Sequence, residues 1–448
     1  IENSILMTSK SKMKPFIYLL ALLLGNFFAQ SQNTYQASAA KDFDLIHTKL
    51  DLKPDWNTNQ LIGNAELTLK PWFYEQDTLI LDAKGFEIET VELNGKSAAY
   101  DYNSLKISIP LGRNFGPEEK LMVAITYVAK PDELTQIPAL EGLKYKGLYF
   151  VNKTENKPQQ IWSEGETEYN SCWFPTLDSP NQKHTQEISL TVPKAFESLS
   201  NGLLVSSKDN GDGTKTDTWK QDLPHSVYLT MIAAGPFKKV VDSTYSDFEV
   251  SYYVEPEYEK EATHIFGRTP EMINYFESLL GIKYPWQKYA QMAVRDYVSG
   301  AMENTSATIH GSRIQKTVNQ LVDENSDAVI AHELFHHWFG DLVTAESWAN
   351  LPLNEAFANY SEYLWDAHKN GKDAADWNNF VELNQYLNES DNKQVSVIRF
   401  YHDDKEDMFD SHSYAKGGRV LHMLRKEVGD KAFFRSLKLY LDQHSFKT

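Results

Sequence analysis

Hydrophobic and polar residues alternate along much of the first half of the chain. Three short runs show the alternation most clearly, at residues 65–69, 105–109 and 122–127. Because successive side chains of a strand point to opposite faces of a sheet, a period of two predicts half-buried β-strands. Turn residues separate such runs, at Asn94 and Gly95 and again in the Asn-Gly-Asp-Gly segment 210–213. We therefore predict an antiparallel, β-rich domain over residues 31–237.

The periodicity changes near Pro236, after which apolar residues recur at spacings of three and four. This spacing places them on one face of a helix. Helical stretches are predicted at residues 263–280, 326–339, 353–370 and 418–444. Gly340 and Gly371 follow the stretches 326–339 and 353–370, as glycine commonly follows a last helical turn. Pro352 suits the first turn of the stretch 353–370. Residues 238–448 should therefore form a second, mostly helical domain of a multidomain α+β protein.

Length and composition agree with this division. The chain has 448 residues, of which 41% are hydrophobic and 13% aromatic, enough to bury more than one core. Its formal net charge of −18 argues against a nucleic acid or an anionic membrane surface as a partner. The single cysteine, Cys172, excludes an intrachain disulfide, and we expect it to be a buried apolar residue rather than a nucleophile.

Residues 1–30 have the pattern of a targeting segment. Lysines at positions 10, 12 and 14 precede the apolar run 16–24, and small or polar residues follow at positions 29–31. This order is typical of a signal peptide, and the apolar run is too short to span a membrane comfortably. We expect translation to start at Met7 or Met13. The mature protein should be exported, periplasmic or secreted, with no stable membrane span; an uncleaved envelope anchor is the alternative.

The residues with the clearest chemical meaning lie in the second domain. His332 and His336 are four positions apart in a predicted helix, so both imidazoles lie on one face, about one turn apart. Imidazole nitrogens bind Zn²⁺, and a catalytic zinc site has three protein ligands, one of which can be a carboxylate. Glu355, near the start of the next predicted helix, is the candidate third ligand. Glu333 lies beside the first histidine and is placed to act as general base on the attacking water.

Further motifs indicate the family that the chain resembles. Eighteen residues separate His336 from Glu355, which matches the zinc signature of the M1 aminopeptidases. Tyr414, in a Tyr-Ala-Lys-Gly segment, is similar to the catalytic tyrosine of that family, and Glu166 lies where the family has a Gln or Glu that contacts the substrate amine. Five consecutive residues are identical to the exopeptidase motif of the family: Gly300, Ala301, Met302, Glu303 and Asn304.

The resemblance runs from about residue 43 to the end of the chain and implies a fold and an activity. The expected fold is a β-rich N-terminal domain followed by a thermolysin-like zinc metallopeptidase domain. The expected activity is removal of the N-terminal residue from peptides with a free N-terminus, with one Zn²⁺ per chain. Glu303 and Glu166 would then bind the substrate ammonium, the other residues of the motif 300–304 would contact the substrate, and the Tyr414 hydroxyl would stabilise the oxyanion.

The sequence also departs from the family pattern. Beside the third ligand, Pro352 and Ala356 stand where the family usually has Trp and Gly, although neither position carries a ligating group. Cys172 is displaced relative to the Phe-Pro-Cys-Phe-Asp segment of the family. The helical C-terminal domain expected in the family is missing from the sequence, and we expect the catalytic domain to be truncated at its C-terminal end.

Three functions remain open at this point. Paired histidines on a helix are also common as packed core residues. The interpretation as a zinc site therefore depends on two further features, the third ligand and the exopeptidase motif. A zinc aminopeptidase is favoured because Glu303 supplies an anchor for a free amine. A thermolysin-like endopeptidase would lack such an anchor. An inactive binding module on the same fold would have lost ligands or the base, whereas His332, His336, Glu355 and Glu333 are all present.

Overall fold

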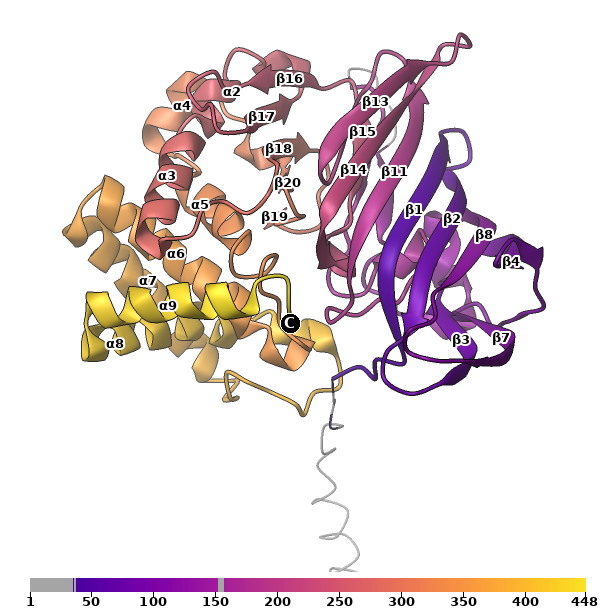
Figure 1. The fold of residues 1–448 in the computed structure, drawn as a ribbon. Helices are drawn as coiled ribbons and strands as arrows, with labels where there is room; N and C mark the ends of the chain where they lie inside the picture. The colour runs from indigo at the N-terminus through magenta and orange to yellow at the C-terminus, as the bar shows by residue number, and fades with distance from the viewer. Residues whose placement is uncertain (1–34, 36–37, 152–156) are drawn as a thin grey trace, which may run out of the picture.

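The computed structural model of the chain describes Tyr35, residues 38–151 and residues 157–448. The predicted signal peptide, within residues 1–30, lies outside the described residues. Figure 1 shows the strand-rich first domain, coloured indigo to magenta, beside the second domain, coloured rose to yellow. A β-rich half is thus followed by a mostly helical half, as the hydrophobic pattern predicts.

The largest part of the first domain is an eight-stranded sheet. In spatial order its strands are β13 (Leu203–Asp209), β14 (Thr214–Ser226), β11 (Lys183–Pro193), β1 (Phe43–Asp55), β2 (Gln60–Pro71), β8 (Leu121–Ala129), β4 (Glu87–Leu93) and β5 (Lys96–Ser97). β2 and β8 bury every second side chain, as alternation requires. All neighbours are antiparallel except β1 and β11, which pair in parallel. This pair differs from the antiparallel prediction because no hairpin joins these two strands.

Two smaller sheets complete the first domain. The first has the order β3 (Gln76–Asp82), β7 (Lys106–Phe115) and β6 (Asp101–Tyr102), and the second has the order β12 (Glu197–Ser200), β15 (Ile232–Gly235), β10 (Gln160–Ser163) and β9 (Leu148–Val151). Buried aliphatic side chains from the sheets pack into one core. β10 matters for the site because the chain continues from Ser163 directly to Glu164 and Glu166.

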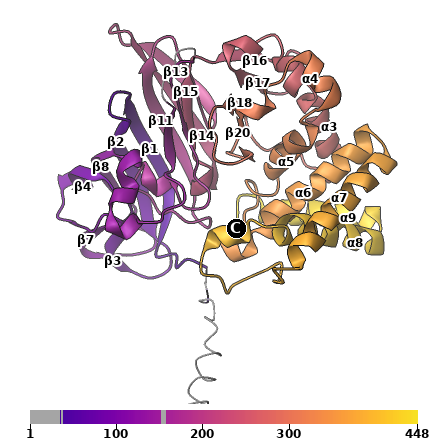
Figure 2. The same ribbon diagram turned by 180° about the vertical axis from the view of Figure 1, so that it is seen from behind.

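The second domain begins with a five-stranded sheet, and the predicted boundary near Pro236 falls between β15 and its first strand. The spatial order is β16 (Lys238–Val241), β17 (Glu249–Val254), β18 (Lys288–Val294), β20 (Ala307–Gly311) and β19 (Ala301–Met302). The helices are α2 (Ala262–Phe266), α3 (Thr269–Leu280), α4 (Val318–Asp323), α5 (Asp327–His336), α6 (Pro352–Lys369), α7 (Lys372–Ser390), α8 (Gly417–Val428) and α9 (Asp430–His444). Figure 2, the view from behind, shows most of them on the side away from the first domain.

The predicted helical stretches are helical in the structure, with two interruptions. α5 and α6 match their predicted ranges to within three residues. The stretch 263–280 divides into α2 and α3 at Gly267, and the stretch 418–444 divides into α8 and α9 at Gly429. Gly429 has a φ of +79°, which glycine adopts without the steric cost that other residues meet, so the chain turns there. Within the described residues, none of the helices has both the length and the apolar character that crossing a membrane requires.

A close contact between α6 and α8 shapes the second domain. A Cβ atom added to Gly417 of α8 would lie 2.5 Å from the Cβ of Ala356 on α6, closer than carbon atoms can pack. Gly417 thus makes room for the methyl group that Ala356 carries in place of the usual glycine. α8 follows directly on a π-helix, His412–Lys416. The contact therefore holds the segment with Tyr414 against the helix with Glu355.

This contact predicts a compensating pair of substitutions. Gly417→Ala should lower the free energy of unfolding by about 1–3 kcal/mol, because two methyl groups would overlap. Adding Ala356→Gly to that variant should recover part of the loss, since it removes the opposing methyl. Chemical denaturation measures both, with Gly116→Ala as the control, where the nearest atom to a new Cβ is 3.7 Å away. Equal losses at Gly417 and Gly116 would contradict the packing argument.

Candidate metal centre and active site

Two helices bring the three predicted zinc ligands together. α5 carries His332 and His336, and α6 carries Glu355 in its first turn. Glu355 Oε2 lies 3.2 Å from His332 Nε2 and 3.5 Å from His336 Nε2, and all three residues are buried. Donor atoms about 2.0–2.1 Å from one tetrahedral Zn²⁺ lie roughly 3.3 Å from each other. The three donors therefore converge at the separation that a single zinc ion requires.

The local sequence explains how these helices reach their positions. Gly340, shortly after α5, has a φ of +142°, and a Cβ there would lie 2.9 Å from Nδ1 of His336. Glycine therefore lets the chain leave the helix without displacing the ligand ring. Pro352 occupies the first turn of α6, as predicted, where its missing N–H costs no hydrogen bond. Glu355 comes three residues later, within that same first turn.

Each ligand histidine is oriented through its second ring nitrogen. His332 Nδ1 donates a hydrogen bond to Glu362 Oε1 at 2.8 Å, and His336 Nδ1 donates to the carbonyl oxygen of Phe339 at 3.1 Å. These bonds leave Nε2 of both rings free to face a metal ion. Glu362 was not predicted from the sequence. Its position seven residues after Glu355, two helical turns along the same face, was the available signal.

Glu333 is buried between the two ligand histidines along α5. Burial raises the pKa of its carboxyl group to about 8, although His332 and His336 lower it. It lines a cavity of about 270 Å³ together with His336 and Glu355. The carboxylate is therefore placed beside the metal ligands and can take up and release a proton near neutral pH.

Glu303 and Glu166 lie close to Glu355. Oxygen atoms of these three carboxylates lie within 4.8 Å of one another. Glu303 Oε1 accepts a hydrogen bond from the Tyr228 hydroxyl at 3.1 Å, and Tyr228 in turn accepts one from Asn354 at 3.1 Å. Burial raises the pKa of Glu303 and of Glu166, and the neighbouring carboxylates add to the rise. Such a cluster favours a cation between its members.

The remaining residues of the motif 300–304 have different positions. Ala301 and Met302 form β19 at the edge of the sheet, and both line the 270 Å³ cavity with Glu303. Gly300 is held by its carbonyl oxygen, which accepts a hydrogen bond from the Gly311 N–H at 3.0 Å. Asn304 is fully buried, and its carbonyl oxygen accepts from the Ala307 N–H at 2.8 Å. Neither Gly300 nor Asn304 is among the residues that line this cavity.

Tyr414 lies on the π-helix and reaches the same cavity. Its ring is nearly parallel to that of His332, with an interplanar angle of 12° and centroids 6.0 Å apart. Burial raises the pKa of Tyr414 well above its ordinary value, and Glu355, Glu166 and Glu303 raise it further. The hydroxyl therefore stays protonated and can donate a hydrogen bond beside the metal ligands.

Two further side chains were not predicted from the sequence. Tyr228 comes from the first domain, 75 residues before its partner Glu303, and no local pattern connects them. Glu164 Oε1 accepts from the Glu166 N–H at 3.0 Å, and the other oxygen accepts from the Tyr297 hydroxyl. Burial raises the pKa of Glu164 to about 7, while the Tyr297 hydrogen bond lowers it. Glu164 thus helps to hold the strand end that presents Glu166.

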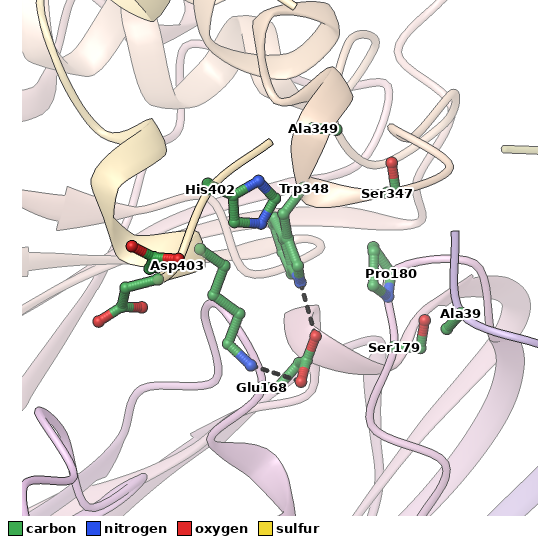
Figure 3. Close-up of a pocket in the computed structure, with 11 residues that line it drawn as sticks. Ala39, Glu168, Ser179, Pro180, Ser347, Trp348, Ala349, His402 and Asp403 are labelled. Carbon is green, nitrogen blue, oxygen red and sulfur yellow. Dashed lines mark hydrogen bonds and ion pairs between the residues drawn. The ribbon is translucent and has the colours of Figure 1, made fainter. Parts of the chain in front are cut away.

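A larger cavity, of about 480 Å³, lies at the boundary of the two domains (Figure 3). The carboxylate of Glu168 accepts a hydrogen bond from the Trp348 indole at 3.0 Å and a charge-assisted one from Lys405. Figure 3 shows the Trp348 indole and the Glu168 carboxylate directed at one another. None of the three zinc ligands lines this cavity. We therefore place the chemistry in the smaller cavity, which includes His336 and Glu355.

Comparison with known sequences agrees with this geometry. Residues 40–229 match the peptidase M1 N-terminal domain, and residues 265–448 match the peptidase family M1 domain. The chain belongs to peptidase family M1. Among M1 relatives, human glutamyl aminopeptidase is 31% identical over 322 residues, which are 67% of this chain and 32% of that protein. Probable aminopeptidase 1 of Sulfurisphaera tokodaii is 27% identical over 88% of this chain and 48% of its own length. The chain thus spans about a third of the glutamyl aminopeptidase.

Solved M1 structures share the two-domain fold. The M1 zinc metallopeptidase of Deinococcus radiodurans superposes with a TM-score of 0.76 at 24% identity, covering 91% of this chain and 88% of that chain. Yeast LTA4 hydrolase superposes with a TM-score of 0.78 at 22% identity, covering 94% of this chain and 65% of that chain. At this identity the likeness establishes the fold: a β-rich domain followed by an M1 catalytic domain.

The metal assignment predicts different behaviour for two neighbouring glutamates. Glu355→Ala leaves two protein ligands, so zinc should be lost on dialysis, as elemental analysis would show. Glu333→Gln keeps all three ligands and should retain one zinc per chain. Its turnover of an aminoacyl chromogenic amide should fall by roughly 10²-fold, because the amide cannot accept a proton. Stoichiometric zinc in Glu355→Ala would contradict the ligand set.

Proposed function

We propose that this M1 protein is a zinc-dependent aminopeptidase that removes the N-terminal residue from peptides. The observation that carries the proposal is the carboxylate cluster of Glu166 and Glu303 within 4.8 Å of the ligand Glu355. An ammonium group is the natural partner for such a cluster, since charge-assisted hydrogen bonds are strong in a buried site. The site therefore offers an anchor for a free N-terminus directly beside the metal ligands.

The reaction follows from the positions of the side chains. Zinc held by His332, His336 and Glu355 would polarise the scissile carbonyl and acidify the attacking water. Glu333 accepts the proton of that water and passes it to the leaving amine. Attack builds negative charge on the carbonyl oxygen, and the Tyr414 hydroxyl donates a hydrogen bond to it. Because this charge exists only in the transition state, Tyr414 contributes to turnover more than to binding.

Anchoring the ammonium also determines which bond is cut. Oxygen atoms of Glu166 and Glu303 lie within 4.8 Å of an oxygen of the proposed zinc ligand Glu355, so a bound N-terminus would place the first peptide bond at the metal centre. An endopeptidase needs a cleft that accepts chain on both sides, without a charge that selects the end. An inactive binding module would have lost ligands or the base, whereas the three ligands and Glu333 are all present. Both alternatives are outcomes of the experiment that follows.

Acetylation of the peptide N-terminus tests the proposal. It removes the ammonium and should lower kcat/KM by at least about tenfold, because the carboxylates then lack their charged partner. Glu303→Ala should lower kcat/KM on free peptides by a comparable factor. It should lower kcat/KM on acetylated peptides almost no further, since both changes remove the same interaction. Equal or internal cleavage of acetylated peptides would favour the endopeptidase. Zinc binding without cleavage of any peptide would favour the inactive module.

We also propose that the protein is exported, periplasmic or secreted, through cleavage of its N-terminal segment. The support is the order of three lysines, the apolar run 16–24 and small or polar residues 29–31. N-terminal sequencing of protein recovered from the envelope or the medium should give a first residue near Gln30. Exported protein that still begins at Met7 or Met13 would instead favour an uncleaved anchor.

A further inference from the structure

The segment that carries Tyr414 has little regular structure of its own. Residues 391–411, between α7 and the π-helix His412–Lys416, contain only a short 3-10 helix, Lys405–Met408, among the named elements. A catalytic hydroxyl must be held within roughly 0.5 Å of its productive position to be effective. Something other than a long helix must therefore fix the start of the π-helix.

Asp410 caps the start of this π-helix. One oxygen of its side chain, Oδ1, accepts hydrogen bonds from the N–H groups of His412 and Ser413, each at 3.0 Å. Its backbone carbonyl oxygen accepts from the Tyr414 N–H at 3.1 Å. Asp410 thus binds the backbone of the turn up to and including the catalytic tyrosine.

Arg399 holds Asp410 in a planar, two-point ion pair. Its guanidinium donates to Asp410 Oδ2 at 2.6 Å and to Oδ1 at 3.0 Å, and the two side chains are only 8% and 6% exposed. The same guanidinium donates to the Ser413 hydroxyl at 3.0 Å and to the Met408 carbonyl oxygen at 3.2 Å. A lysine could not make this fork, because its ammonium is a single point of charge. Hydrogen bonds from Arg399 and Lys393 hold the pKa of Asp410 below its ordinary value, although burial alone would raise it.

The ion pair is also tied to the helices around the metal centre. The Arg399 N–H donates to the Ala349 carbonyl oxygen at 3.2 Å, in the turn just before α6. His412 Nδ1 donates to Glu389 Oε1 on α7 at 2.8 Å. Glu389, Asp410 and His412 are close enough together to hold a metal ion. The cationic Arg399 against Asp410 makes a positional role the better account of the cluster.

We propose that Arg399 and Asp410 are positioning residues that hold the Tyr414 hydroxyl at the reacting carbonyl oxygen. The proposal rests on the proposed function, because it acts through the oxyanion contact of Tyr414. Neither residue touches the cavity that contains the zinc ligands. Weakening the ion pair between Arg399 and Asp410 should shift the Tyr414 hydroxyl slightly. The zinc ligands and the carboxylates proposed to bind the ammonium should stay in place. The loss should therefore fall on kcat and leave KM nearly unchanged.

A double-mutant cycle with Tyr414→Phe tests this. In the otherwise natural protein, Asp410→Asn and Arg399→Lys should each lower kcat by about tenfold or more, with KM changed less than about twofold. In the Tyr414→Phe background the same substitutions should lower kcat by less than about twofold, since the hydroxyl they position is already gone. Arg399→Ala should resemble Arg399→Lys or be worse. If it fails to fold, the two conservative variants still decide the question.

Arg425 and Asp430 provide a control pair with the same two-point geometry but greater exposure. Arg425 binds Asp430 through two hydrogen bonds of 2.9 Å between α8 and α9, away from the cavity. Arg425→Lys and Asp430→Asn should leave kcat unchanged, and all variants should keep one zinc per chain by elemental analysis. Equal losses in both Tyr414 backgrounds, or a rise in KM alone, would overturn the proposal and mean that the pair is merely structural. If Tyr414→Phe itself has normal kcat, the oxyanion role in the proposed function fails first, and the positioning role falls with it.

Discussion

Six glutamates line the cavity beside the proposed zinc ligands, and the charge that they can carry is the constraint that the rest of the site must satisfy. Glu164, Glu303, Glu333 and Glu355 are buried, and Glu166 and Glu406 are partly buried. Removing several carboxylates from water costs several kcal/mol for each unless cations compensate. A metal ion can compensate part of this charge, and a substrate ammonium another part. The proposed exopeptidase activity would meet this need, because a substrate without a free ammonium would leave some of these carboxylates unpaired.

The first domain takes part in meeting that constraint. Beyond Glu303 the chain makes a tight turn in which Ser306 has a φ of +63°, unusual for a residue other than glycine. The turn is held from the first domain, since Asn201 donates to the Thr305 carbonyl oxygen at 2.9 Å. The buried Lys288 donates to the Ser306 carbonyl oxygen at 3.1 Å and to that of Ser200 at 2.9 Å. Contacts across the domain boundary therefore fix the direction in which Glu303 points.

The parts of the molecule that could be predicted are those with local periodicity or fixed spacing. His332, Glu333 and His336 share one helix, so their geometry follows from 3.6 residues per turn. Glu355 was found because its motif stands at a set distance along the chain. By contrast, Arg399 and Asp410 lie in an irregular segment whose path depends on its contacts. No pattern in the sequence predicts that they form an ion pair. The division of the last helical stretch at Gly429 was missed because one glycine within an amphipathic pattern is also compatible with a continuous helix.

Contacts between residues far apart in the sequence could not be predicted either, because no local pattern connects such residues. Tyr228 joins Glu303 to Asn354, yet these three residues come from a first-domain turn, a strand end and a helix start. If Glu303 binds an amine as proposed, this one hydroxyl would make occupancy of that site and docking of the two domains parts of a single equilibrium. Any rotation that separates the domains withdraws a donor from Glu303 and so changes its affinity for a cation. By reciprocity, a cation at Glu303 must bias the domains toward or away from their docked arrangement by the same free energy.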